Sequence, residues 1–371
     1  KKVKTKLNEV NILEKITSKH FMFFIVAPLA ATLFNYPSTF IRLGGRNTWI
    51  FSIISSLIFL LFAWIILSII SKKNAYDFKQ VCYKSLGKHL GNLFLFIFSL
   101  CLVLACIECA TVSSSSIHTN IFIKTPIWYS LLFFIGTALF ISKNGFRSVL
   151  ITTIISVSIL SVLSIIIILL SIKYTNLRHL LPILKNVSIN TWATSIISQL
   201  GSFSSFFILL PFLNRINDKK NLKKTSFITI PLVLSCLIFF IVNLISSIGA
   251  ERSGNIFYPE FIQTQLISFG GFIENGDILT MVISIFLWTI KYVISIFSLY
   301  TIWKNKFKNK LIFLSVISLI VYISSLYLGN NVYTLFSILP YYQYINFVVF
   351  FVFPIIIYGI YAVRKKAKVH K

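Results

Sequence analysis

Charged residues are scarce in this chain of 371 residues. Asp, Glu, Lys and Arg make up 12% of it, whereas a soluble protein of ordinary composition has roughly twice that fraction. Hydrophobic residues account for 57% of the chain, and the mean hydropathy is +0.86. The composition excludes an ordinary soluble protein and indicates an integral membrane protein.

Acidic residues, histidine and cysteine are rarer still, with 9 Asp and Glu, 5 His and 5 Cys. No paired carboxylates, His/Asp cluster, nucleophile motif or phosphate-binding loop is visible, which disfavours a membrane-embedded enzyme. Cys101, Cys106 and Cys109 share one apolar stretch, but their spacing resembles no metal motif, so we expect small buried apolar residues. The sequence predicts no catalytic residue, no cofactor and no metal site.

A cleavable signal peptide is not expected. The first 19 residues are basic and polar, and no small-residue cleavage site follows the first apolar run. The chain opens on Lys rather than Met, which leaves open whether residues precede it.

Apolar runs of about 17 to 25 residues predict membrane-spanning helices. They predict an all-α membrane protein with about ten spans, which places both termini on one side. The spans are expected at 20–41, 48–70, 92–117, 127–142, 148–172, 191–213, 225–249, 278–300, 311–328 and 341–363.

The basic residues then predict the orientation. With the N-terminal tail taken as cytoplasmic, 27 Lys and Arg lie on that side and 7 on the other, and Lys291 lies within a span. Such an asymmetry is what the positive-inside rule describes. The net charge of +26 therefore fits topology and anionic lipid headgroups, and no nucleic-acid partner is expected.

Glycine and proline are few, 14 and 9, so their positions inside spans are informative. Gly201-Ser202-Phe203, followed by Pro211, interrupts the sixth span, and Pro28 to Pro37 interrupts the first. Backbone groups freed inside a membrane must face protein, water or a ligand. Two broken helices in corresponding halves indicate a transporter-type binding site.

The span count and the two breaks predict a 5+5 inverted repeat with helices 1 and 6 broken. The expected parts are a cytoplasmic basic tail (1–19), a first five-helix repeat (20–172), a connecting loop (173–190), a second repeat (191–363) and a cytoplasmic basic tail (364–371). Two further segments, Asn74–Leu90 on the inside and Tyr258–Phe272 on the outside, are predicted as interfacial helices.

Several motifs resemble the endospore germination permease family, the B subunits of GerA-type nutrient germinant receptors. The similarity runs from about residue 17 to 365. It rests on Gly45-x-x-x-Trp49, Asn176-Leu177 with Leu181-Pro182, Leu209-Leu210-Pro211-Phe212-Leu213, Tyr258-Pro259, Gly270-x-Phe272-x-Glu274-x-x-Asp277 and Lys291 fourteen positions on.

This resemblance implies the amino acid–polyamine–organocation transporter fold, which is leucine-transporter-like. It also implies a multi-pass protein of the spore inner membrane, partner A and C subunits, and the sensing of a small nutrient, often an amino acid. The chain departs from the family at Ala30-Ala31-Thr32, where a Gly-x-Gly is usual, and at Ser202, where an acidic residue is common. The resemblance therefore does not name the ligand.

Two ionisable residues are expected deep within spans, Glu108 in the third and Lys291 in the eighth. Buried charges in a membrane are costly and mark functional or structural sites. Glu108 is predicted either to bind a ligand amine or proton, or to make a structural hydrogen bond. Lys291 either pairs with Glu108 or holds the place of a coupling cation; we lean towards separate roles, because the two residues differ in depth along their spans.

The breaks supply the remaining candidate ligand contacts, because half-helix ends present N–H groups and hydroxyls can complete the shell. These candidates are Thr32, Asn35, Tyr36, Gly201, Ser202, Ser204 and Ser205. Close helix packing is the alternative for the serines. Aromatic residues near span ends predict an interfacial belt: Trp49, Trp128, Trp192, Trp303, Tyr341 and Tyr342.

The function predicted is a germinant-receptor subunit that binds a small nutrient in the membrane. The alternative is a proton-coupled amino-acid transporter of the same fold, since fold alone does not decide between them.

Overall fold

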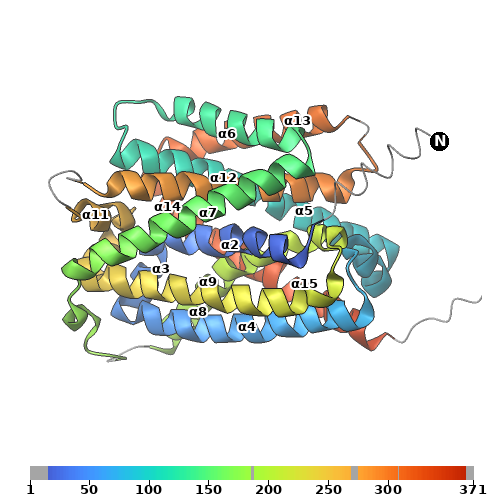
Figure 1. The fold of residues 1–371 in the computed structure, drawn as a ribbon, viewed down its shortest axis with the longest axis horizontal. Helices are drawn as coiled ribbons and strands as arrows, with labels where there is room; N and C mark the ends of the chain where they lie inside the picture. The colour runs from blue at the N-terminus through green and yellow to red at the C-terminus, as the bar shows by residue number, and fades with distance from the viewer. Residues whose placement is uncertain (1–15, 185–187, 269–274, 308, 365–371) are drawn as a thin grey trace, which may run out of the picture.

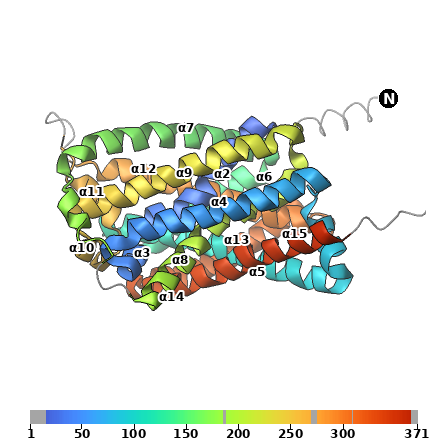
Figure 2. The ribbon, with the colours of Figure 1, turned by 90° about the horizontal axis from the view of Figure 1, so that it is seen from below.

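The computed structural model describes residues 16–184, 188–268, 275–307 and 309–364. Within these residues the protein is all-helical, and the only strand-like pairing is a single bridge between Ile16 and Ile216. The long helices run along one common axis (Figure 1, Figure 2). Of the family-like motifs, Gly270, Phe272 and Glu274 lie outside the described residues, as do most of the two basic tails.

The helices follow one another in the order expected for a polytopic protein. In chain order they are α2 (Ser18–Asn35), α3 (Pro37–Gly44), η1 (Gly45–Asn47), α4 (Thr48–Lys73), α5 (Phe78–Asn120), α6 (Ile127–Lys143), α7 (Phe146–Ser171), η2 (Ile172–Tyr174), η3 (Leu177–Leu180), α8 (Ile189–Ser204), η4 (Ser205–Arg215), α9 (Lys219–Ile248), α10 (Ala250–Asn255), α11 (Pro259–Gln265), α12 (Asp277–Trp303), α13 (Lys310–Gly329), α14 (Val332–Asn346), the π-helical η5 (Phe347–Val352) and α15 (Phe353–Val363).

Each of the ten predicted spans contains helix. Eight helical segments of the described chain are long and apolar enough to cross a membrane. The other two predicted spans correspond to α2, with 18 residues, and α6, with 17. At about 1.5 Å of rise per residue, 17 residues reach about 26 Å, slightly short of a bilayer core. The chain is thus an integral membrane protein.

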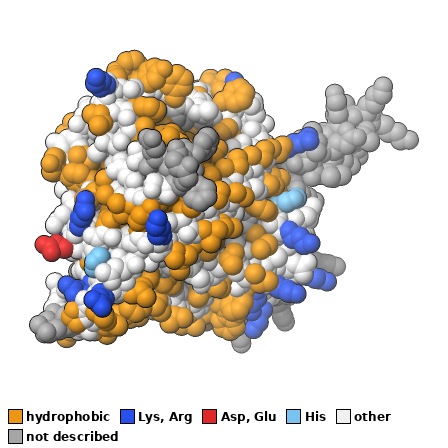
Figure 3. Space-filling model, turned by 60° about the vertical axis from the view of Figure 1, so that its left-hand side comes forward, with side chains coloured by type: hydrophobic (Ala, Val, Ile, Leu, Met, Phe, Trp, Pro, Cys, Tyr) orange, Lys and Arg blue, Asp and Glu red, His pale blue; other side chains and the backbone are white. Residues whose placement is uncertain are grey.

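Burial separates central helices from peripheral ones. In the most apolar stretch of each span, the share of buried residues is 89% for Ile189–Arg215 and 78% for α12. The share is only 22% for Phe146–Tyr174 and 28% for α13. The peripheral helices expose leucine, isoleucine and phenylalanine over the flank of the bundle (Figure 3). Such a surface suits lipid rather than water. The α8–η4 segment, which carries the candidates of the sixth span, and α12, which carries Lys291, therefore belong to the interior of the bundle.

The predicted breaks take two different forms. In the first span, α2 ends at Asn35, Tyr36 has non-helical backbone angles (φ −148°, ψ 59°), and α3 begins at Pro37. Proline suits a first helical position, because its missing N–H would have no partner there. In the sixth span the chain stays helical but changes from α-helix to 3₁₀-helix at Ser204 and Ser205.

The loops gather at two opposite ends of the bundle. At one end Ile16 N–H donates to Arg215 O (3.0 Å), and Arg364 Nη1 donates to Lys84 O (2.6 Å). At the other, Ser38 Oγ donates to Phe257 O (2.7 Å) and Arg42 Nε to Gly254 O (3.2 Å). We call the second end, which carries α10 and α11 (Figure 2), the outer end, and the first the inner end.

The predicted interfacial segment Asn74–Leu90 contains a helix that begins at Phe78. A kink at Gly87 separates this helix from the third span, and both belong to α5; the non-helical backbone of Gly87 (φ 81°, ψ 178°) suits glycine. Its outer counterpart is α11, which covers part of the predicted Tyr258–Phe272 segment; residues 269–272 lie outside the described residues.

Candidate functional site

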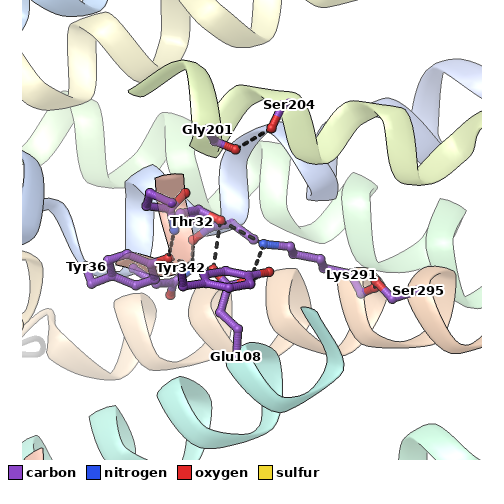
Figure 4. Close-up of polar contacts among 11 residues, drawn as sticks. Thr32, Tyr36, Glu108, Gly201, Ser204, Lys291, Ser295 and Tyr342 are labelled. Carbon is purple, nitrogen blue, oxygen red and sulfur yellow. Dashed lines mark hydrogen bonds and ion pairs between the residues drawn. The ribbon is translucent and has the colours of Figure 1, made fainter. Parts of the chain in front are cut away.

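A polar cluster lies in the apolar interior, where the break in the first span faces α5, α12 and α14 (Figure 4). The Glu108 carboxylate of α5 is at its centre. Its Oε1 accepts from the hydroxyls of Thr32 (3.1 Å) and Tyr36 (2.6 Å), and its Oε2 from Lys291 Nζ (2.7 Å) and the Tyr342 hydroxyl (3.0 Å). Four donors from three segments, the first span, α12 and α14, thus satisfy one buried carboxylate.

Lys291 is the counterion of Glu108. The side chains are 0% and 2% exposed, and Lys291 Nζ also donates to Thr32 Oγ1 at 2.7 Å. The ammonium lies 5.2 Å from the centre of the Trp288 ring, close enough for a cation–π contact. The preference for separate roles was therefore wrong in its geometry: helix depths estimated from sequence are too coarse to exclude a contact between helices that enter from opposite sides.

Tyr36 owes its position to the break. Its hydroxyl donates to Glu108 and accepts from Gln343 Nε2 at 2.6 Å. Its ring stacks on Phe40 and on Trp288, with centroids 6.0 and 6.2 Å apart. The non-helical backbone at Tyr36 thus turns the side chain into the cluster and joins the carboxylate to α14.

Asn35 is also buried, but it does not bond to the cluster. Its Nδ2 donates to Ala31 O at 2.7 Å, one turn back in α2, while its Oδ1 has no protein partner among the described residues. The side chain therefore keeps a free acceptor in the interior.

The candidates of the sixth span lie on its most buried stretch. Gly201 packs directly on the backbone of α14, where an added Cβ would overlap the carbonyl oxygen of Gln343. Ser204 Oγ donates to Gly201 O (2.6 Å) and to Asn346 O (3.2 Å). These contacts give Gly201 and Ser204 a packing role, as small residues often have in membrane helices.

Ser202 and Ser205 differ from Ser204. Both hydroxyls are buried, and neither has a hydrogen-bond partner in the described part of the chain. Further unpartnered polar atoms belong to α12 and α14: Trp288 Nε1, Gln343 Oε1, and both amide atoms of Asn346. Buried polar groups are normally paired, so this set offers hydrogen-bonding capacity to a polar ligand.

Two cluster residues were missed from the sequence. Tyr342 was assigned to the interfacial belt, but it is 7% exposed and bonds to Glu108, whereas its neighbour Tyr341 is 69% exposed. Successive helical residues point about 100° apart, so one faces inwards and the other outwards. The second missed residue is Gln343. Both residues belong to the largely polar stretch Tyr341–Asn346 inside an apolar span, and this stretch was the signal that could have identified them.

The arrangement holds a salt bridge and several hydroxyls, but among the described residues no group of three or more His, Cys, Asp and Glu could hold a metal ion. A separate pocket of about 670 Å³ lies at the outer end. Three arginines, Arg46, Arg178 and Arg252, line it together with His179 and Glu251, and none of the cluster residues does.

Comparison with known proteins identifies the family. One solved structure that resembles the fold is the crystal structure of a mutant of the Eremococcus coleocola manganese transporter, at 15% identity and a TM-score of 0.49, covering 91% of this chain and 76% of that chain. No curated protein matches. The family model described as spore germination protein, a spore permease model, matches residues 15–334. The chain therefore belongs to the spore germination protein family, a family of permease-like membrane proteins.

Proposed function

We propose that this protein is the permease-like subunit of a nutrient germinant receptor. It binds a small germinant, an amino acid, at the Glu108 cluster inside the membrane and triggers germination together with A and C partner subunits. The observation that carries the proposal is the buried Glu108–Lys291 pair, placed at the break of the first span. Family membership supports the link to germination.

The chemistry of the cluster suits a zwitterion. An amino acid carries an ammonium and a carboxylate, which can pair with Glu108 and Lys291 respectively once these separate. A ligand that supplies both charges replaces both halves of the internal pair, so neither side chain is left as an unpaired buried charge. The unpartnered hydroxyls of Ser202 and Ser205 and the amide of Asn346 can complete its hydrogen bonds.

The proposed location is the spore inner membrane, with both termini cytoplasmic. The 27-to-7 distribution of basic residues supports this orientation. Loops predicted to be cytoplasmic contact one another at one end of the bundle, and loops predicted to be external do so at the other end. This separation supports the proposed topology.

Binding of a panel of radiolabelled amino acids to the purified protein tests the proposal. We expect at least one to bind, and Glu108→Gln to weaken that binding tenfold or more, about 1.4 kcal/mol. Glu251→Gln, which neutralises an exposed carboxylate at the outer end, should bind like the original protein. Absence of binding across the panel, or equal binding by Glu108→Gln, would contradict the proposal.

The second candidate, a proton-coupled amino-acid transporter, rests on the same carboxylate, because a buried Glu beside a Lys can exchange a proton. Uptake into proteoliposomes under an inward proton gradient separates the two. Accumulation that depends on the gradient supports the transporter, and binding without uptake supports the receptor.

A further inference from the structure

A second buried carboxyl lies at the outer end, in a helix that the proposed function does not use. Glu260 is the second residue of α11 and is 1% exposed. The helix packs against α12, α9, α7 and α3. Figures 1 and 2 show it at the end of the bundle opposite the start of α2.

Glu260 has no partner to balance a charge. Neither carboxyl oxygen has a hydrogen-bond partner in the described part of the chain, and the hydroxyl of the nearby Tyr258 has none either. The one ion pair found among the described residues is Lys291–Glu108. This contrasts with Glu108, whose two oxygens accept four hydrogen bonds.

The helices packed on α11 carry few charges near it. On α3, Arg42 directs its Nε to Gly254 O, and on α12 the half-buried Asp277 accepts from Gln265. On α9 the charged residues are four lysines, all at its inner end, and on α7 the one charged residue, Arg147, lies at the inner end too. Burial without a counterion raises the pKa of Glu260 well above its usual value.

An ionised carboxylate in such a place would be costly, so burial favours the protonated form of Glu260 while α11 stays packed against the bundle. Displacement of α11 from α12 and α3 would hydrate the side chain and return its pKa towards about 4.3, the value of a free Glu. The proton would then be released to the outer side.

We propose that Glu260 is a proton-binding site of the outer end, whose single proton is released when α11 moves outwards. Protonation holds α11 against the bundle, and rising external pH favours its displacement. The chemistry is an ordinary acid dissociation: the O–H bond breaks, its electron pair stays on the carboxylate and water takes the proton. The site is independent of the germinant proposed above, because it rests on the burial of Glu260 and its lack of a partner.

Hydrogen–deuterium exchange of the α11 amides in the purified full chain tests this inference. After correction for the intrinsic pH dependence of exchange, the opening constant of the original protein should rise up to tenfold per pH unit, as linkage to one proton requires. The opening constant should rise over the pH range between the pKa of the hydrated Glu260 carboxyl and the pKa of the buried one. No ligand is needed, so failure of the germinant assignment leaves this result unaffected.

Three variants make the test specific. Glu260→Gln keeps the shape but cannot titrate, so its opening constant should not change with pH. Glu260→Asp should keep the slope, which covers the case in which Gln disturbs folding. Asp277→Asn removes a half-buried carboxylate at the same end and should also keep the slope. A flat profile in the original protein, an unchanged slope in Glu260→Gln, or loss of the slope in Asp277→Asn would each overturn the proposal.

Discussion

At the residue scale, Glu108 and Glu260 differ in the number of hydrogen-bond donors that surround each carboxyl group. Both are buried, but Glu108 accepts from an ammonium and three hydroxyls, whereas Glu260 accepts from no group in the described chain. Burial with no donor raises the pKa of Glu260 well above its usual value. The protein therefore contains two buried carboxyls with different hydrogen-bonding environments.

The ion pair gives a prediction for paired substitutions. Glu108→Gln leaves Lys291 as an unpaired buried cation, and Lys291→Met leaves an uncompensated carboxylate; each should lower stability by about 3 to 5 kcal/mol. The double variant leaves no buried charge and should partly recover. Thermal unfolding in detergent measures this, with Glu251→Gln as the control. A double variant as unstable as the sum of the singles would show that the pair contributes no coupling energy.

The two tyrosines that donate to Glu108 should contribute unequally to the stability of the protein. Tyr36→Phe removes a donor to Glu108 and the acceptor of Gln343 Nε2, whereas Tyr342→Phe removes one donor. A buried polar group left without a partner costs about 1 to 3 kcal/mol, so Tyr36→Phe should be the more destabilising. Unfolding midpoints of the two variants decide it; an equal or reversed order would contradict the assigned bonds.

Asp218 gives a pH prediction at the inner end. Burial alone would raise its pKa, but hydrogen bonds from Ser18 N–H and Oγ outweigh burial and lower it. A lowered folded pKa adds stability above the unfolded value of about 3.9, which is lost as pH falls through the folded pKa. Thermal midpoints between pH 7 and 3 should therefore fall less for Asp218→Asn than for the original protein. An identical fall would contradict the role of Ser18.

The sequence pointed to Glu108, Lys291, Thr32 and Tyr36, because a charged residue or a helix interruption within an apolar span can be recognised from the sequence alone. It did not find Tyr342 or Glu260. Tyr342 resembles any aromatic residue near a span end, and Glu260 lies in a polar segment where a carboxylate is ordinarily solvated. Tyr342 bonds to Glu108 of α5, and α11 packs against α12, α9, α7 and α3, so the burial of both residues depends on helix packing.

At the scale of elements, the two predicted breaks are not equivalent. Tyr36 leaves the helical region altogether, while the sixth span tightens into eleven residues of 3₁₀-helix. Runs of 3₁₀-helix beyond three or four residues are uncommon and often mark strain or a hinge. A Gly/Ser sequence indicates that a helix departs from regular geometry there, but it does not indicate which departure occurs.

Gly201 gives a prediction for the packing of α8 on α14. An alanine Cβ would overlap the Gln343 carbonyl oxygen, so Gly201→Ala should force the helices apart, destabilise the protein by about 1 to 3 kcal/mol and weaken the nutrient response; leucine should abolish the response.

Gly136 of α6 is the matched control, because nothing lies within 4 Å of its added Cβ. Gly136→Ala should be neutral or slightly stabilising. Unfolding midpoints and nutrient response of both variants test the difference. A Gly201→Ala protein that behaves like Gly136→Ala would contradict the close contact.

At the scale of the whole molecule, hydropathy predicted the helices well, because lipid requires long apolar runs and leaves few alternatives. Each predicted span contains helix, and the family match confirms the class of protein. The 5+5 inverted repeat stays a prediction, since span count and break placement do not by themselves establish an internal symmetry. The relative depth of two residues on different helices cannot be determined from the sequence pattern either. This is why the sequence favoured separate roles for Glu108 and Lys291.

The orientation of the bundle is the last prediction, motivated by the 27-to-7 division of basic residues. In a background without the native cysteines, single cysteines at Lys220 and Lys306, both exposed at the inner end, should resist an impermeant thiol reagent added outside. A cysteine at Arg252 should react. Arg252 suits this test because its side chain is exposed at the outer end. Permeabilised membranes serve as the control, since all three positions should then label. Labelling at Lys306 but not at Arg252 in intact membranes would reverse the orientation, and with it the side from which a germinant reaches the Glu108 cluster.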